Sequence, residues 1–224
     1  FWGGFSLVFS DRYLFLMALL IILLNWVNTT GEYMLAELVV RHADRLLAAD
    51  PSIDRSGVIA SFYGSFFSIV NLLALLLQIF LVARILRWIG VRGAVLVLPI
   101  IALIGYGIAV FIPVFSIIRV VKLVENATDY SLMNTTRHAL YLPLSPAKKY
   151  EGKTTIEGFF WRFGDLAQAV AVYVGLHVFN FGVRDFAVVN MVLSLAWLAV
   201  AFALSREFSR REQEAVLNLP PRLY

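Results

Sequence analysis

The chain contains no cysteine, and charged residues make up only 15% of its 224 positions. The absence of cysteine excludes a disulfide framework, a thiolate metal site and a cysteine nucleophile. The three histidines, His42, His138 and His177, are too dispersed along the sequence to form a metal-ligand cluster. Hydrophobic residues, in contrast, make up 60% of the chain, and the mean hydropathy is +0.79. These values are far from those of a soluble domain and predict an integral membrane protein.

Six stretches are apolar over the roughly 20 residues that a helix needs to cross a bilayer. They are too long for barrel strands and lack the alternation of barrel strands, so the predicted fold class is an all-α membrane protein. The predicted spans are residues 13–40, 57–86, 93–112, 114–142, 154–181 and 186–204. This division predicts a linker at 1–12, a six-helix transmembrane domain at 13–204 and a C-terminal tail at 205–224.

Basic residues gather in alternate loops, after the second, fourth and sixth spans. These residues are Arg84, Arg87, Arg92, Lys148, Lys149, Lys153, Arg206, Arg210 and Arg211. By the positive-inside rule the linker, the tail and these loops are predicted to be cytoplasmic. The basic residues that give the formal charge of +4 therefore act as signals for orientation in the membrane, and we expect no nucleic-acid partner. The first residues lack the basic region of a signal peptide, and we expect the chain to be a fragment whose upstream part is missing.

The fourth span is the least apolar, because it carries charged side chains at what should be membrane depth. At about 100° per residue its polar side chains share one helical face. This face holds Arg119, Lys122, Glu125, Asn126, Asp129, Tyr130 and Arg137. Charges at membrane depth cost several kcal/mol unless they face a cavity or each other, so we predict a helix that lines a wet path. The alternative is an ion-pair network that only holds helices together.

Two other spans carry a similar polar face. In the first span Asn25, Asn28 and Glu32 recur at helical spacing, with Gly31 beside them to allow a bend or close packing. In the fifth span Arg162, Asp165 and Gln168 follow at three-residue steps. We therefore expect the three helices to share one cavity. Thr154 and Glu157 have the spacing of a capping box, which predicts a helix start there.

Residues 130–157 also resemble a known family. A Tyr-Ser-Leu helix at 130–132 leads to a basic residue, a Pro-Leu turn, a Lys-x-x-Gly-Lys loop and an Ile-Glu helix start. The matching positions are Tyr130, Ser131, Leu132, Arg137, Ala139, Pro143, Leu144, Lys149, Gly152, Lys153, Ile156 and Glu157. This pattern resembles the nucleotide transporter family, the ATP/ADP translocases of plastids and intracellular bacteria. The six spans and the basic loop at 83–93 are typical of one half of a twelve-helix major-facilitator transporter.

The resemblance implies a carrier that exchanges nucleotides by alternating access, without hydrolysis. It implies the C-terminal half of such a protein, embedded in a bacterial inner membrane beside a six-helix N-terminal half. We expect no cofactor and no enzymatic activity, since no metal cluster, nucleophile motif or glycine-rich phosphate loop is present. Glu32 looks like the family's intramembrane glutamate, and Arg137 stands at the place of its basic residue. Asp165 departs from the family, because the best-known translocases carry a lysine there.

Chemistry suggests roles for the polar side chains. Arg119, Lys122 and Arg137 would contact phosphate oxygens, since arginine offers a bidentate fork. Acidic side chains would pair with basic residues in gating states, and Tyr130 or Asn134 would orient a base or ribose. The full candidate set is Glu32, Arg119, Lys122, Asn126, Asp129, Tyr130, Asn134, Arg137, Arg162 and Asp165.

Two other functions are compatible with the same residues. On the polar faces of the predicted spans, four basic side chains are balanced by four acidic ones, so this part of the carrier offers no net attraction to a nucleotide. The basic residues are Arg119, Lys122, Arg137 and Arg162, and the acidic residues are Glu32, Glu125, Asp129 and Asp165. A proton-coupled carrier of another organic ion could use Glu32 or Asp129 as its titrating group. A membrane scaffold that transports nothing could use the polar network for packing alone.

Overall fold

The computed structural model describes residues 2–217, and these residues form helices and connecting turns with no strand among them. This confirms the predicted all-helical class. The first half of the chain contains α1 (Trp2–Ser10), α2 (Arg12–Ala49), α3 (Arg55–Leu77), the π-helix η1 (Gln78–Val82) and α4 (Ala83–Phe111). The second half contains α5 (Phe115–Thr128), η2 (Asp129–Met133), α6 (Asn134–Ala139), α7 (Pro146–Thr155), η3 (Ile156–Phe160), α8 (Trp161–His177) and α9 (Val183–Leu217).

The helices begin and end where the sequence offers caps and breakers. The Asp11 side chain accepts from the backbone N–H of Tyr13 at the start of α2, and Asp54 accepts from Ser56 and Gly57 at the start of α3. The chain leaves the helical conformation at 112–114, around Pro113, and resumes as α5. Gly90 has a φ of 66°, which breaks the helical run through η1 and α4 into two arms.

Three helical stretches are long and apolar enough to cross a membrane, namely Arg12–Ala49, Arg55–Phe111 and Val183–Glu214. The second of these is 57 residues long and includes the break at Gly90, so it contains two of the predicted spans. The predicted spans at 114–142 and 154–181 correspond to α5–η2–α6 and to the helical run that ends with α8. Neither of these two runs is among the three stretches that are long and apolar enough to cross a membrane. The number of six spans therefore remains a prediction.

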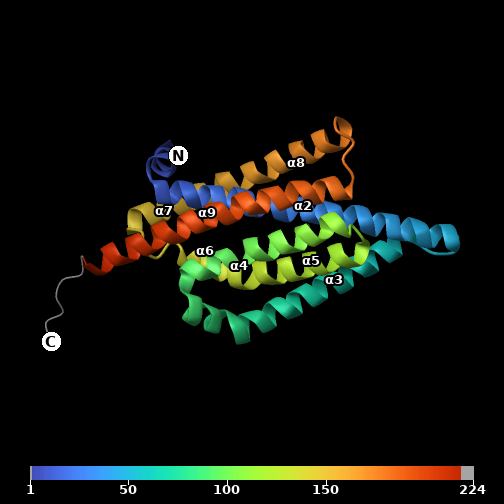
Figure 1. The fold of residues 1–224 in the computed structure, drawn as a ribbon, viewed down its shortest axis with the longest axis horizontal. Helices are drawn as coiled ribbons and strands as arrows, with labels where there is room; N and C mark the ends of the chain where they lie inside the picture. Colours follow the sequence, from blue (N-terminus) through green and yellow to red (C-terminus); the bar gives the residue numbers. More distant parts are fainter. Residues whose placement is uncertain (1, 218–224) are drawn as a thin grey trace.

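The long helices run side by side as a bundle (Figure 1). Helix α9 packs against α2 and α4, while α2 also contacts α5 and α8. Helix α8 lies at one edge of the view and α3 at the other (Figure 1). The start of α1 and the far end of α9 lie toward the same end of the bundle, as expected if both termini face the same side (Figure 1).

At this end of the bundle Asp11 forms ion pairs with Lys148 and Arg211, and we call these three residues the Asp11 clamp. Asp11 is 2.9 Å from Lys148 Nζ of α7 and 2.6 Å from Arg211 Nη2 of α9. Burial alone would raise the pKa of Asp11, but the hydrogen bond from Lys148 and the charges of Arg211 and Lys148 hold that pKa below its ordinary value. The clamp therefore joins the beginning of α2 to α7 and α9.

The structure adds detail to two of the predicted domain bounds, which stay predictions, and it corrects the expected capping box. Residues 2–10, assigned to a linker, form α1, which packs against α7. The capping box was wrong, because α7 begins at Pro146 and the chain runs as a continuous helix through Thr154 and Glu157; Thr154 Oγ1 donates to the Tyr150 carbonyl instead. Helix α9 continues to Leu217, into residues assigned to the tail, and the rest of the tail, 218–224, lies outside the described residues.

Candidate functional site

The buried centre of the bundle holds an ammonium group surrounded by oxygen atoms. The Lys122 side chain on α5 is 0% exposed, and its Nζ donates to the side-chain oxygen and the backbone carbonyl of Asn28 on α2. The same Nζ lies 3.3 Å from Glu125 Oε2 and 3.4 Å from Glu32 Oε1. We call Lys122, Asn28, Glu32, Glu125, Asn126 and Tyr106 the Lys122 cluster.

Neighbouring side chains hold both carboxylates of the cluster in place. Asn126 Nδ2 donates to Glu32 Oε1 at 2.7 Å, and Tyr106 Oη of α4 donates to Glu125 Oε2 at 2.7 Å. Charge-assisted hydrogen bonds of this kind lower the cost of burying the charges. The Lys122 cluster therefore ties α2, α4 and α5 together.

Gly31 makes the close approach at the cluster possible. A Cβ added to this residue would collide with the Tyr106 hydroxyl and lie 2.8 Å from Lys122 Cδ. Only a residue without a side chain leaves room for both groups against α2. The expectation that Gly31 permits close packing is thus confirmed.

A second polar contact joins α2 to α8. Asn25 Nδ2 donates to Asp165 Oδ1 at 2.6 Å and to the Trp161 carbonyl at 3.0 Å. Arg162, whose side chain is 84% exposed, approaches Asp165 only to 3.8 Å. Gly164 supports the approach of α8, since a Cβ there would lie 3.3 Å from Asn25 Nδ2.

Arg137 of α6 stands out among the cations of the candidate set. Its guanidinium lies 5.0 Å from the centre of the Trp161 ring, and its Nη2 donates to Asn134 Oδ1 at 3.2 Å. Its buried Nε has no hydrogen-bond partner, and Arg137 forms no ion pair among the described residues. A guanidinium without a carboxylate partner keeps its capacity to bind an anion.

The remaining candidates lie apart from the Lys122 cluster or face outward. Arg119 packs its guanidinium 5.6 Å from the Phe62 ring of α3. Asp129 is buried, while the Tyr130 ring is 48% exposed and Asn134 is exposed. Of the ten predicted site residues, the structure joins Glu32, Lys122 and Asn126 in one cluster. It joins Asn134 to Arg137, and Arg162 to Asp165, in separate contacts.

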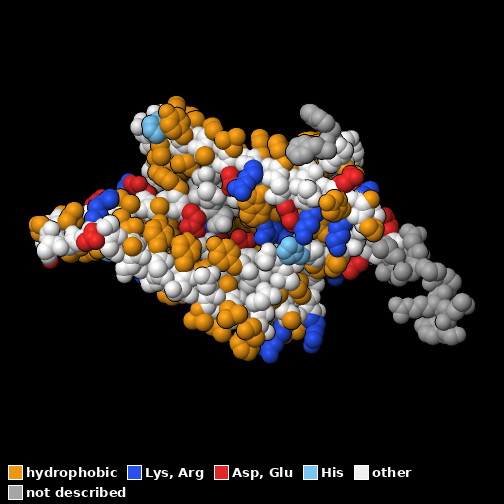
Figure 2. Space-filling model, turned by 180° about the vertical axis from the view of Figure 1, so that it is seen from behind, with side chains coloured by type: hydrophobic (Ala, Val, Ile, Leu, Met, Phe, Trp, Pro, Cys, Tyr) orange, Lys and Arg blue, Asp and Glu red, His pale blue; other side chains and the backbone are white. Residues whose placement is uncertain are grey.

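Two hollows border these residues. The first has a volume of about 580 Å³ and lies between α2, α3 and α8. It is lined by Thr29, Glu32, Tyr33, Ala36, Tyr63, Gln168, Ala169, Val172, Tyr173, Leu176 and His177. Glu32 and Gln168 thus face one hollow, as expected for the first and fifth spans. Its lining among the described residues includes Tyr63 of α3 and no residue of the fourth span, so the expectation that all three polar helices share this cavity was wrong. Figure 2 shows acidic and basic side chains in the middle of one face of the molecule, between apolar patches.

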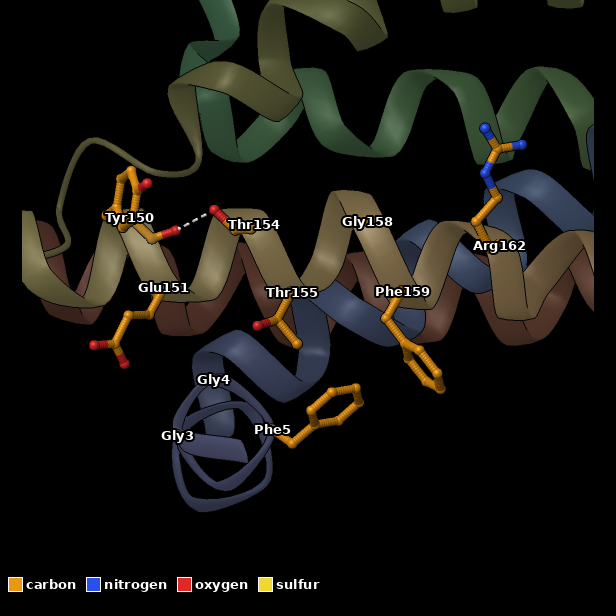
Figure 3. A pocket seen from close by; sticks show the side chains of 10 residues that line it. All are labelled: Gly3, Gly4, Phe5, Tyr150, Glu151, Thr154, Thr155, Gly158, Phe159 and Arg162. Atoms are coloured by element: carbon orange, nitrogen blue, oxygen red, sulfur yellow. Dashed lines mark hydrogen bonds between the residues drawn. The ribbon is translucent and has the colours of Figure 1, made fainter. Parts of the chain in front are cut away.

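The second hollow, of about 600 Å³, lies between α1 and the α7–η3 helix (Figure 3). The Phe5 and Phe159 rings meet edge to face there, with their centres 4.7 Å apart, and Gly3, Gly4 and Gly158 are among the other lining residues. The Arg162 side chain points to the other side of its helix, away from Phe5 and Phe159 (Figure 3). The lining of this hollow carries one basic residue, Arg162, and one acidic residue, Glu151, so it offers no net positive charge to a phosphate group and is not our candidate substrate site.

Sequence reasoning left three residues of the Lys122 cluster out of the candidate set. Glu125 was placed on the polar face without a role, Asn28 was placed on the polar face of the first span, and Tyr106 was not considered. A signal for Tyr106 exists, because it is a hydroxyl-bearing residue between two glycines in an otherwise apolar run. Its partner could not be read from the sequence, since Tyr106 and Glu125 lie on different helices.

Comparison with known proteins matches the second half of the chain to a transporter family. Residues 106–208 match the family described as TLC ATP/ADP transporter. A stretch of 102 residues is 28% identical to ADP,ATP carrier protein 2 of Chlamydia pneumoniae. That match covers 44% of this chain and 19% of the carrier's length. No solved structure matches the chain. The resemblance to the nucleotide transporter family, predicted from residues 130–157, is therefore confirmed.

Proposed function

We propose that this chain, which carries a segment of the TLC ATP/ADP transporter family, is part of a membrane carrier that exchanges nucleotides such as ATP and ADP. The family match supports nucleotides as substrate. Long apolar helices with a polar interior support a carrier in a membrane. We place the chain in the C-terminal half of a major-facilitator-like protein in a bacterial inner membrane, with both termini cytoplasmic.

The observation that carries the proposal is the unpaired guanidinium of Arg137. A buried or half-buried cation in an apolar bundle is costly unless it has an anionic partner at some stage of its working cycle. Arg137 has a ring and an amide as neighbours and no ion-pair partner among the described residues. A phosphate group supplies the missing anion, and it fits the bidentate fork of arginine.

The other candidate residues take roles that follow from their surroundings. Arg119 and Arg162 offer further cations to phosphate oxygens, since each is free of a short ion pair among the described residues. Lys122 is held by Asn28 and two carboxylates, so it would reach a phosphate only by releasing them. Tyr130 presents a half-exposed ring on which a base can stack, next to the exposed Asn134.

The carrier cycle would change the partners of the acidic residues. Glu32 and Asp165 each accept a hydrogen bond from an asparagine on another helix. Such interhelical contacts can break and reform when one half of a carrier rocks against the other. We therefore assign Glu32, Asp165 and the buried Asp129 to gating contacts rather than to substrate binding.

The test is counter-exchange of labelled ATP by Arg137→Gln in the full-length carrier, reconstituted at equal protein. Loss of one charge-assisted contact worth about 1.5–3 kcal/mol should lower kcat/KM about 10- to 100-fold. Arg137 also supplies a favourable charge to the buried Asp129, so membrane abundance is measured beside exchange, and exchange should fall at equal reconstituted protein.

Arg206→Gln is the matched control, since Arg206 also lies over an aromatic ring, 4.3 Å from Phe202, without an ion pair among the described residues. Its exchange should equal that of the parent protein. Unchanged exchange in Arg137→Gln would contradict the assignment of Arg137 to phosphate binding. Reduced abundance that a second, neutralised acid restores would assign Arg137 to helix packing instead.

A further inference from the structure

The Lys122 cluster contains one cation and two carboxylates. The Lys122 ammonium lies 3.3 Å from Glu125 and 3.4 Å from Glu32, and it is the cation within ion-pair distance of either of them among the described residues. With both acids ionised, the cluster therefore carries one excess negative charge. An uncompensated charge in an apolar interior costs several kcal/mol, and a bound cation or proton removes that cost.

Glu125 is the more deeply buried of the two acids and is incompletely hydrogen-bonded. Its side chain is 2% exposed, compared with 32% for Glu32. Tyr106 donates to Oε2, while Oε1 is buried and has no hydrogen-bond partner among the described residues. An ionised carboxylate in such a place normally accepts several hydrogen bonds, so Oε1 is the atom of the cluster that is suited to carry a proton.

Glu32 connects this buried acid to the outside. It lines the 580 Å³ hollow between α2, α3 and α8, and one third of its side chain is exposed. On its inner side the same carboxylate lies 3.4 Å from the ammonium that also contacts Glu125. The ammonium between the two acids can pass one of its protons to Glu125 and take one from Glu32, which in turn takes a proton from water in the hollow.

No second fixed cation offsets the excess charge around Glu125 among the described residues. Helix α9 contributes Asn190, which is uncharged and donates to the Val27 carbonyl. Arg119, on the same helix as Glu125, packs on Phe62 instead. The titratable and charged groups that surround Glu125 are Glu32 from α2, Tyr106 from α4, and Lys122 and Asp129 from its own helical run.

We propose that Glu125 is a proton-binding site, reached from the hollow through Glu32, and that its protonation accompanies the transport cycle. The proton leaves a hydronium ion in the hollow and binds a lone pair of the Glu125 carboxylate, and no electron is transferred. The cluster then holds a neutral acid beside a balanced Lys122–Glu32 pair. Release of the proton returns Lys122 to its position between two ionised carboxylates.

Infrared difference spectroscopy on the reconstituted full-length protein tests this site without any nucleotide. Lowering the pH should produce the carbonyl band of a buried protonated carboxylic acid. The band should be lost in Glu125→Gln and retained in Glu212→Gln, which neutralises an exposed acid near the end of α9. Absence of an acid-dependent band in the parent protein, or its retention in Glu125→Gln, would overturn the proposal.

Two further variants keep the test decisive if Glu125→Gln fails to fold. Tyr106→Phe removes the hydroxyl that stabilises the ionised acid, so the band should appear at higher pH than in the parent. Glu32→Gln leaves one carboxylate for the one ammonium, so the band should appear at lower pH than in the parent. After a rapid pH drop it should also appear at least about tenfold more slowly, because the relay group is lost. An unmoved pH midpoint in Tyr106→Phe would refute the assignment to Glu125.

Measurement of ATP uptake under a proton gradient distinguishes proton coupling from the identity of the substrate. With one proton carried per nucleotide, a tenfold proton gradient should raise ATP accumulation by up to about tenfold. ATP movement that is indifferent to the gradient would refute coupling and leave nucleotide exchange intact. If no ATP moves, the proposed substrate is wrong, and the infrared band alone decides the proton site.

Discussion

Replacement of Lys122 by methionine is the sharpest test of the Lys122 cluster as a structural element. The change keeps most of the side-chain volume and removes the ammonium group, which donates to Asn28 and lies within 3.4 Å of two carboxylates. Glu125 then remains buried with Tyr106 as its hydrogen-bond donor among the described residues. We expect the variant to be much less stable than the parent protein.

The magnitude follows from the burial of the partners. Removal of one member of a buried ion pair costs about 3–5 kcal/mol, because it leaves an uncompensated charge in an apolar interior. For a chain of this length 1 kcal/mol shifts Tm by about 2–4 °C, so Lys122→Met should lower Tm by about 6–20 °C. The double variant Lys122→Met/Glu125→Gln should recover most of this loss, since the remaining Glu32 is one third exposed and can be hydrated.

The assay is thermal unfolding of the purified protein in detergent, followed by the fraction that remains monomeric after heating. Lys153→Met is the matched control, because Lys153 forms a partly exposed ion pair with Glu157 at 3.9 Å. Such a pair contributes about 0–1 kcal/mol, so the control should lose little. A Tm for Lys122→Met within about 2 °C of the parent value would refute the account of the cluster.

Three further predictions concern topology, packing and pH. A C-terminal tag and a probe at 147–152 should be accessible from the cytoplasm, and a probe at 42–55 only from outside; opposite labelling would overturn the charge rule as applied here. Gly31→Ala should destabilise the protein by about 1–3 kcal/mol through its clash with the Lys122 cluster, whereas Gly64→Ala, with no neighbour within 4 Å, should not. Asp11 has a lowered pKa, so the stability it contributes is present above its ordinary pKa and lost as the pH falls through its folded-state pKa. Asp11→Asn should therefore be less stable than the parent near neutral pH, and the two should converge in strong acid; a constant difference would contradict the assignment.

The helical architecture could be predicted because hydrophobicity and caps are local signals. Apolar runs of about 20 residues, the break around Pro113 and the cap at Asp54 all lie within short windows of sequence. The capping box at Thr154 failed for the same reason. Its spacing satisfies the rule, but Pro146 begins a helix earlier, and η3 continues that helix past Glu157 without interruption.

The candidate site could be predicted only in part, because helical periodicity places residues on faces but does not pair faces. The polar faces of the first and fourth spans do meet, at Glu32, Asn126 and Lys122. The sequence gives no sign that Lys122 is held by Asn28, or that Tyr106 reaches Glu125 from another helix. These contacts depend on the close approach that Gly31 permits, which is a property of the packed helices.

Counter-exchange of labelled ATP tests the central claim most directly. The full-length carrier is reconstituted into vesicles loaded with ADP, and protein-free vesicles serve as the background. Nucleotide exchange predicts uptake of label that requires internal ADP and that excess unlabelled ATP or ADP suppresses. Uptake at the background level, or uptake that neither nucleotide suppresses, would contradict the account.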